Sequence, residues 1–188
     1  NISPADILAV VSVFTVIVLP SFITDVIWSG LGRSGKKFAF HFSDVAPDLI
    51  ILGKGLSSSI PLSAVIAKGD LLKKWPPGAH TSTFQGNPIA CAVACATLRE
   101  IENSKLIEHV SNSIASSFGE LKHDLISYDV VKDVRFVGAQ CAIEFNNSAI
   151  ATEVQKLALS KAKLLTYGGG RKGECVLLLP PINIDKTI

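Results

Sequence analysis

Three short apolar runs in the first part of the chain each lead into a polar or glycine-containing segment. They span residues 18–24, 48–52 and 62–67; Asp25 follows the first run, and Gly53-Lys54-Gly55 follows the second. Apolar runs of about four to eight residues that end in this way are typical of buried strands. Because helical patterns follow them, we expect an α/β domain with parallel strands.

The pattern changes after residue 105. Helices are predicted at residues 70–75, 89–102, 105–127 and 149–162, and further strands at 130–137, 141–145 and 175–179. We therefore predict two domains. Residues 1–105 form part of a larger α/β domain with a mainly parallel sheet, and residues 106–188 form a small α+β domain.

The composition indicates a large buried surface. Apolar residues make up 48% of the chain and charged residues 18%, with a net charge of +2. No basic patch stands out, so we expect no nucleic-acid partner. Cys91 and Cys95 lie four residues apart in an Ala-rich stretch, and none of the four cysteines forms a Cys-x-x-Cys pair. We interpret them as packed thiols rather than metal ligands, in a reducing, cytoplasmic location.

The segment at residues 7–19 (ILAVVSVFTVIVL) is the strongest membrane signal in the sequence. A bilayer-spanning helix needs about 20 apolar residues, and this run is shorter. A signal peptide needs a basic region before the apolar run, and here the preceding charge is Asp6. We therefore expect a buried segment and no membrane partner, with a membrane-tethered protein as the alternative.

A glycine-rich stretch at residues 30–35 (GLGRSG) matches two phosphate-binding patterns in part. The G-x-G-x-x-G pattern of dinucleotide sites requires a helix directly afterwards, and the G-x-x-x-x-G-K pattern requires Ser or Thr after its lysine. Residues 36–42 (KKFAFHF) are a poor helix opening, and position 37 is a lysine. We interpret the stretch as a flexible loop.

Asp25 and Lys54 form a more informative pair, because each follows an apolar strand. In open parallel sheets, ligands bind beyond the carboxyl ends of the strands. An amine and a carboxylate placed there suit pyridoxal phosphate (PLP), which needs an amine for a Schiff base and an acid beside its pyridine nitrogen. The alternative is a turn-forming aspartate and a solvated lysine.

The loop at residues 80–88 (HTSTFQGNP) is rich in hydroxyl groups and leads into a helix N-terminus. Backbone N–H groups and the helix dipole favour an anion such as phosphate at that position. Ordinary capping of the helix by Asn87 explains the same residues equally well.

Taken together, these stretches resemble the class III (ω-amino acid) aminotransferases, which are PLP enzymes of fold type I. The resemblance covers residues 22–188. It rests on Asp25 and on four ordered motifs: SGLGRSGKKFAF, PDLIILGKGLSSSIPLSAVIA, WPPGAHTSTFQGNPIACAVACATL and DVRFVGAQCAIEF.

The resemblance implies a role for each matching residue. Lys54 corresponds to the catalytic Schiff-base lysine, and Asp25 to the partner of the pyridine nitrogen. Ile27 stands where the family has a valine against the cofactor ring. Thr83 corresponds to the hydroxyl that binds the cofactor phosphate of a neighbouring subunit, which implies a homodimer with shared active sites.

The sequence also departs from the family. Trp28 stands where the family usually has a glutamine beside the cofactor hydroxyl. Leu177 stands where many members have an arginine that binds a substrate carboxylate, which weakens the case for 2-oxoglutarate as the acceptor. Residues 1–21 match the family poorly, and the motif of the phosphate-binding loop that precedes this region is missing. We therefore expect the chain to be the C-terminal part of a longer enzyme.

The leading hypothesis is transamination from an ω-amine or amino acid, such as 4-aminobutyrate, to a 2-oxo acid. Two alternatives share the fold: a catalytically inactive remnant, and a PLP racemase or decarboxylase. They stay open because groups around the substrate select the reaction.

Overall fold

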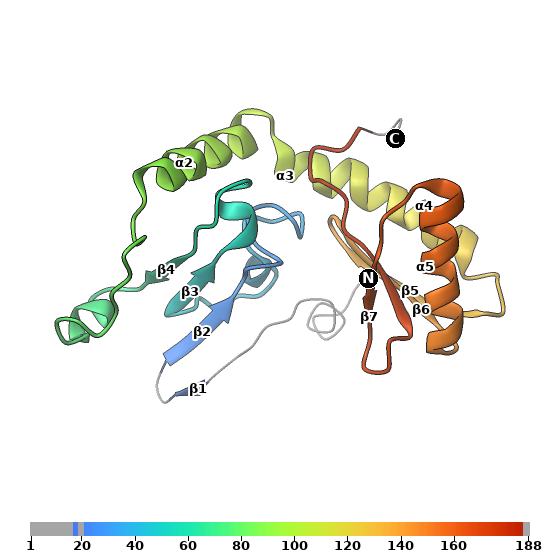
Figure 1. Ribbon diagram of the computed structural model, residues 1–188, viewed down its shortest axis with the longest axis horizontal. Coiled ribbons are helices and arrows are strands. Elements are labelled where there is room, and N and C mark those ends of the chain that lie inside the picture. Colours follow the sequence, from blue (N-terminus) through green and yellow to red (C-terminus); the bar gives the residue numbers. More distant parts are fainter. Residues whose placement is uncertain (1–16, 19–20, 186–188) are drawn as a thin grey trace. The chain divides into compact units, whose positions relative to one another are not determined.

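The computed structural model describes residues 17–18 and 21–185, which form two units (Figure 1). The first unit comprises Asn1–Gly32 and Lys36–Leu106, and the second comprises Arg33–Gly35 and Ile107–Ile188. The observed division thus lies one residue beyond the predicted boundary and assigns a three-residue piece of the glycine-rich loop to the second unit.

The apolar segment at residues 7–19 lies outside the described residues except for Ile17 and Val18. Within the described part of the chain, no helix combines the length and the apolar character needed to cross a bilayer.

The first unit contains a four-stranded sheet in the order β1-β2-β3-β4. Its strands are β1 (Ile17–Val18), β2 (Ser21–Asp25), β3 (Leu49–Leu52) and β4 (Ala64–Ala67). β2 and β3 run parallel, as predicted, with Asp25 beside Ile51.

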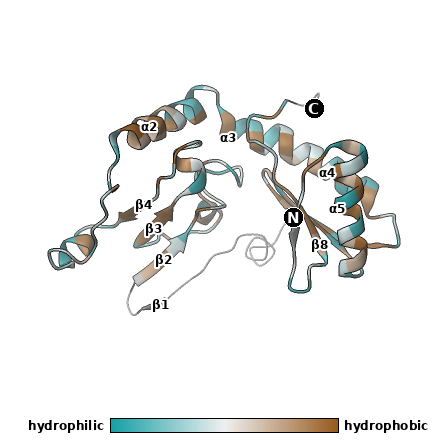
Figure 2. Cartoon of the chain, in the orientation of Figure 1, coloured by the Kyte–Doolittle hydropathy of each residue, from teal (hydrophilic) through white to brown (hydrophobic). Residues whose placement is uncertain are grey.

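The expected direction of β4 is wrong, because β4 runs antiparallel to β3. A parallel return needs a crossover of about a dozen or more residues, usually with a helix. Residues 53–63 contain only the short 3₁₀ turn η2 (Lys54–Leu56), so the chain doubles back beside β3. β3 and β4 are both hydrophobic (Figure 2), yet Val65 and Ile66 of β4 are nearly half exposed.

Helix α2 (Pro88–Asn103) confirms the helix predicted at residues 89–102. Asn87 caps it, since its side-chain oxygen accepts hydrogen bonds from the backbone N–H groups of Ile89 and Ala90. Proline in the first turn needs no such partner, which favours this starting point. Ordinary capping is therefore present at this helix end.

The second unit contains an antiparallel sheet in the order β5-β6-β8-β7. β5 (Val131–Val137), β6 (Gln140–Phe145) and β8 (Cys175–Leu178) agree with the predicted strands, whereas β7 (Tyr167–Gly169) was missed. β7 is short and rich in glycine, so it lacks the apolar run by which strands are recognised.

The helices of this unit are α3 (Leu106–His109), a π-helical segment (Val110–Ile114), α4 (Ala115–Leu125) and α5 (Ser148–Ala162). The helix predicted at residues 105–127 is thus interrupted by a π-helical turn. The core forms where buried side chains of these helices meet the sheet; it includes Val110, Phe118, Val134, Cys141 and Val176. Burial raises the pKa of the Cys141 thiol to about 12, as expected of a packed cysteine.

The glycine-rich loop is anchored rather than built for a dinucleotide. The 3₁₀ turn η1 (Ala39–Phe42), and no α-helix, follows it. Arg33 donates hydrogen bonds to the carbonyl oxygens of Ala139 and Pro180 and accepts one from the Ala139 N–H. Ser111 donates another to the Gly35 carbonyl at 2.8 Å. Burial of the Arg33 guanidinium lowers its pKa.

Gly138 and Gly119 provide a matched test of this packing. Gly138 has φ +56°, and a Cβ there would lie 2.4 Å from the Ser34 carbonyl carbon. We expect Gly138→Ala to lower the free energy of unfolding by roughly 2–4 kcal/mol through left-handed strain and overpacking.

The control is Gly119→Ala within α4, where the added Cβ meets only Phe136 at 3.7 Å. Alanine in a helix should raise the free energy of unfolding by about 0.5–1 kcal/mol. Urea unfolding measures both effects, and equal changes in the two variants would contradict the close approach at Gly138.

Candidate active site

Two neighbouring parallel strands bring Asp25 and Lys54 to the same end of the first sheet. β2 ends at Asp25, and β3 ends at Leu52, two residues before Lys54. The pairing extends one residue beyond β2, because the Val26 N–H donates to the Ile51 carbonyl at 3.1 Å. The carboxylate and the amine therefore both belong to segments that leave the carboxyl ends of paired strands.

A local hydrogen bond orients the Asp25 carboxylate. Its Oδ1 accepts from the backbone N–H of Ile27 at 2.9 Å, an arrangement typical of aspartate at a turn. Ile27 lies against Gly53, where a Cβ would be 3.5 Å from the Ile27 side chain. Asp25 and Ile27 thus lie on a turn that contacts the residue preceding Lys54.

Lys54 begins the turn η2 with a left-handed backbone, at φ +42°. A side chain larger than hydrogen at Gly55 would meet no atom within 4 Å, so space is open beside the lysine. The ammonium nitrogen lies 3.9 Å from the centroid of the Trp28 ring, which is a cation–π contact. The sequence marked Trp28 as a departure from the family but did not reveal this contact.

Ser57 supports the turn that carries Lys54, and sequence reasoning missed it. Its side chain is fully buried, and its hydroxyl donates to the Ala90 carbonyl of α2 at 3.1 Å. Ser58 adds a hydroxyl–hydroxyl bond to Thr97 on the same helix. A run of three serines gives no indication of which one is buried, so the sequence carries no signal for this role.

Thr24 is a second residue that the sequence did not indicate. It precedes Asp25 on β2 and is 1% exposed. Its hydroxyl oxygen is buried without a hydrogen-bond partner among the described residues. A buried hydroxyl of this kind costs stability unless another group satisfies it.

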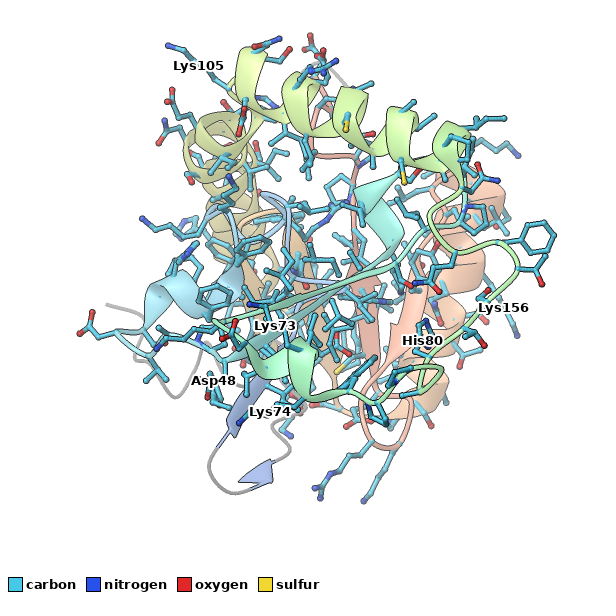
Figure 3. The ribbon with its side chains drawn as sticks, turned by 90° about the vertical axis from the view of Figure 1, so that its left-hand side faces the viewer. Asp48, Lys73, Lys74, His80, Lys105 and Lys156 are labelled. Atoms are coloured by element: carbon cyan, nitrogen blue, oxygen red, sulfur yellow. The ribbon has the colours of Figure 1, made fainter. Side chains whose placement is uncertain are left out.

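Thr83 lies on an exposed turn between η3 (Leu71–Lys74) and α2. Figure 3 shows His80, Lys73 and Lys74 along this segment and Asp48 at the start of β3. Within the part of the chain that the structure describes, no hydrogen bond joins Thr83 to Asp25 or Lys54. The predicted role of Thr83 toward a neighbouring subunit therefore stays a prediction.

Leu177 is a packing residue of β8. It pairs with Ala142 of β6 and Tyr167 of β7, and its side chain approaches Gly169, where a Cβ would lie 2.9 Å from it. The glycine leaves the space that the leucine fills.

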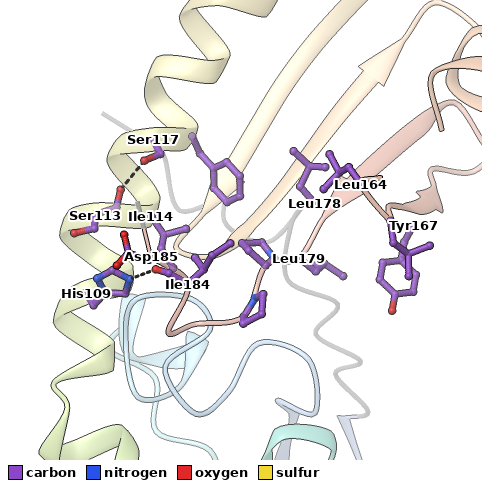
Figure 4. Close-up of a pocket in the computed structure, with 14 residues that line it drawn as sticks. His109, Ser113, Ile114, Ser117, Leu164, Tyr167, Leu178, Leu179, Ile184 and Asp185 are labelled. Atoms are coloured by element: carbon purple, nitrogen blue, oxygen red, sulfur yellow. Dashed lines mark hydrogen bonds between the residues drawn. The ribbon is translucent and has the colours of Figure 1, made fainter. Parts of the chain in front are cut away.

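The second unit also contains a hollow of about 380 Å³ (Figure 4). Two of its polar side chains bond to backbone, since His109 contacts the Ile184 carbonyl at 2.9 Å and Ser117 donates to the Ser113 carbonyl. Most of its lining is apolar, and neither lysine nor arginine contributes to it. Among residues 17–18 and 21–185, no cluster of three or more His, Cys, Asp or Glu could hold a metal ion.

Comparison with known proteins gives a consistent result. The family model for class-III aminotransferases matches residues 18–187. Ornithine aminotransferase of Plasmodium falciparum is 38% identical over 88% of this chain and 40% of its own length. Acetylornithine aminotransferase of Oceanobacillus iheyensis is 36% identical over 86% of this chain and 39% of its own length.

A solved structure of Toxoplasma gondii ornithine aminotransferase superposes with a TM-score of 0.81 at 32% identity. The superposition covers 88% of this chain and 39% of the Toxoplasma gondii chain. That structure is described with partial occupancy of PLP at the protein's active site. The predicted fold class, part of an α/β PLP-enzyme fold, is confirmed by this likeness.

The chain thus spans about two fifths of the length of the curated relatives that it matches. The match nevertheless extends through nearly all the described residues and includes β2, which ends at Asp25, and the turn after β3 that begins at Lys54. The chain belongs to the class III aminotransferases, the family that its motifs resemble.

Proposed function

We propose that this chain is the part of a PLP-dependent aminotransferase that carries the catalytic lysine. The enzyme moves an amino group from an ω-amine or amino acid to a 2-oxo acid. The observation that supports this most directly is the placement of Asp25 and Lys54 beyond the carboxyl ends of paired parallel strands. Ligands bind at that end in open α/β sheets.

The residues present fit the cofactor. One oxygen of Asp25 accepts a hydrogen bond from the Ile27 N–H, and the other can accept one from a protonated ring nitrogen. Ile27 offers an apolar side chain beside Gly53, where one face of a planar ring would pack. Lys54 supplies a primary amine on an exposed side chain with open space at Gly55.

Bound PLP supplies an electron sink for charge developing at the substrate carbon. In this proposal, Lys54 would hold the cofactor through its amine and would carry a proton to and from the substrate carbon. Asp25 would keep the ring nitrogen protonated by ion pairing. Ile27 would pack against the ring.

The donor that we propose carries a terminal primary amine. The relatives are named for ornithine and acetylornithine, and 4-aminobutyrate shares that terminal amine with them. Leu177 offers no cation for a carboxylate, because its side chain is apolar, and it packs on Gly169. Groups other than residue 177 therefore bind the carboxylate of the 2-oxo acid.

Lys54 is one of five described non-glycine residues with a left-handed backbone, together with Leu31, Ser58, Lys105 and Lys163. A left-handed φ costs a non-glycine residue roughly 1–2 kcal/mol. We therefore expect Lys54→Gly to have a higher free energy of unfolding than Lys54→Ala by about 1 kcal/mol. Urea unfolding of the two variants measures the difference, and greater stability of the alanine variant would refute the strain.

The cofactor assignment is tested by adding PLP to the protein, reducing with borohydride and locating the modified lysine by peptide mass. We expect the modification at Lys54, with loss of the absorbance of the lysine-bound cofactor in Lys54→Ala. Asp25→Asn should retain attachment but weaken it, because the ring nitrogen loses its anionic partner.

The matched control for this experiment is Lys68→Ala, which removes an exposed lysine just beyond β4. An unchanged absorbance in Lys54→Ala would reject the assignment. Attachment without transamination of any ω-amine would instead favour an inactive remnant or a different PLP reaction.

We propose that a second copy of the chain covers the segment that carries Thr83. Phe84 beside it is 81% exposed, Ile89 is 65% exposed and Trp75 is 52% exposed. Clustered exposed apolar side chains are typical of interfaces. In such a dimer, Thr83 would reach the cofactor phosphate of the neighbouring subunit.

Phe84→Glu tests the dimer, because a buried charge without a partner opposes association. We expect the dissociation constant of the dimer, measured by light scattering over a range of protein concentrations, to rise at least about tenfold. That ratio corresponds to about 1.4 kcal/mol. Val45→Glu, which changes an exposed apolar residue on a separate loop, should leave the mass unchanged. A dimer equally stable in both variants would contradict the proposal.

A further inference from the structure

Trp28 is the described residue that contacts the Lys54 ammonium group most directly. The ammonium nitrogen lies 3.9 Å from the centroid of the indole ring, well inside the range of a cation–π contact. Among the described residues, no carboxylate forms a salt bridge with Lys54. Trp28 is 42% exposed, so packing in a core does not account for its position.

The backbone on both sides of this contact is held in place. Before Trp28, the Val26 N–H bonds to the Ile51 carbonyl of β3, and the Gly30 N–H closes the turn on the Val26 carbonyl at 2.9 Å. On the other side, the Leu56 N–H bonds to the Gly53 carbonyl at 3.0 Å and closes the turn that begins at Lys54. Because the backbone is held on both sides, only the side chains of Trp28 and Lys54 lose conformational freedom when the contact forms.

We propose that Trp28 is a positioning residue for Lys54. Its indole face holds the free ammonium group beyond the carboxyl end of β3 whenever the amine is not otherwise bound. The consequence for catalysis rests on the proposed function of Lys54, but the contact itself does not. A glutamine at this position could offer hydrogen bonds but no π face, so this positioning of Lys54 depends on Trp28.

The contact limits how often the amine is available to an electrophile. Only those molecules in which the Lys54 amine has left the indole ring can react at a given moment. At an exposed site, a cation–π contact of ordinary strength corresponds to a roughly two- to fivefold shift in that population. Removing the ring should therefore speed the reaction of Lys54 with a small acylating reagent by the same factor.

The experiment acylates the cofactor-free chain with limiting N-hydroxysuccinimidyl acetate and follows each lysine by peptide mass. We expect Trp28→Leu to raise the labelling rate of Lys54 about two- to fivefold relative to exposed Lys68. Trp28→Phe, which keeps an aromatic face, should stay close to the parent. Tyr128→Leu is the matched control, because Tyr128 is an exposed aromatic residue of the second unit with no part in the proposed site.

Nuclear magnetic resonance gives a readout that a merely structural role of Trp28 would not move. Protons over an aromatic face are shifted upfield, so the ε-methylene signal of Lys54 should be upfield in the parent. That shift should disappear in Trp28→Leu, persist in Trp28→Phe and be unaffected by Tyr128→Leu.

Neither readout uses the cofactor, so the inference and the proposed function fail separately. Unchanged Lys54 labelling and an unchanged ε-methylene shift in Trp28→Leu would overturn the inference, even if PLP attaches to Lys54. Failure of PLP to attach to Lys54, with both Trp28 effects present, would overturn the proposed function alone.

Discussion

The parallel pairing of β2 with β3 is the constraint on which the site depends. Because the strands run in the same direction, the chain leaves both at one end of the sheet, and Asp25 and Lys54 leave with it. The register adds a second condition. A slip of one residue would turn the Asp25 side chain to the opposite face of the sheet, since strand side chains alternate. The burial of Thr24, which precedes Asp25, penalises such a slip because it would exchange the environments of the two residues.

The turn after β3 places the Lys54 side chain, which is exposed, just beyond the end of the strand. Gly53 lies close to Ile27, and Lys54 then takes a left-handed conformation that starts η2. A strained turn persists only when its surroundings determine it. Here the buried hydroxyl of Ser57 ties η2 to the first turn of α2 through the Ala90 carbonyl. The rigid helix thus stabilises the turn, and the flexible lysine side chain extends from it.

Most of the elements, and the pair Asp25 and Lys54, could be predicted because their signals are local. Apolar runs and helical spacing depend only on neighbouring residues, and a strand end is readable from the residue that follows it. The antiparallel direction of β4 has no local signal, because it depends on whether residues 53–63 are too few for a crossover. The contact between Trp28 and Lys54 has none either, because it depends on how two side chains from separate turns are oriented. Ser57 was hidden among identical neighbours. The roles of Ile27 and Thr83 toward a cofactor came from resemblance and stay predictions.

The two departures from the family have opposite physical effects. Leu177 is an apolar group that packs at Gly169, at a position where the family resemblance implies an arginine, so the second unit gains packing and has no cation there. Trp28 adds an interaction, since the indole contacts an ammonium group that a glutamine could reach only through a hydrogen bond. Simple decay of an unused site would be expected to remove interactions at both positions. An aromatic ring over the Lys54 ammonium group, on a turn closed by backbone hydrogen bonds, instead indicates that the environment of the Lys54 amine is organised in this chain.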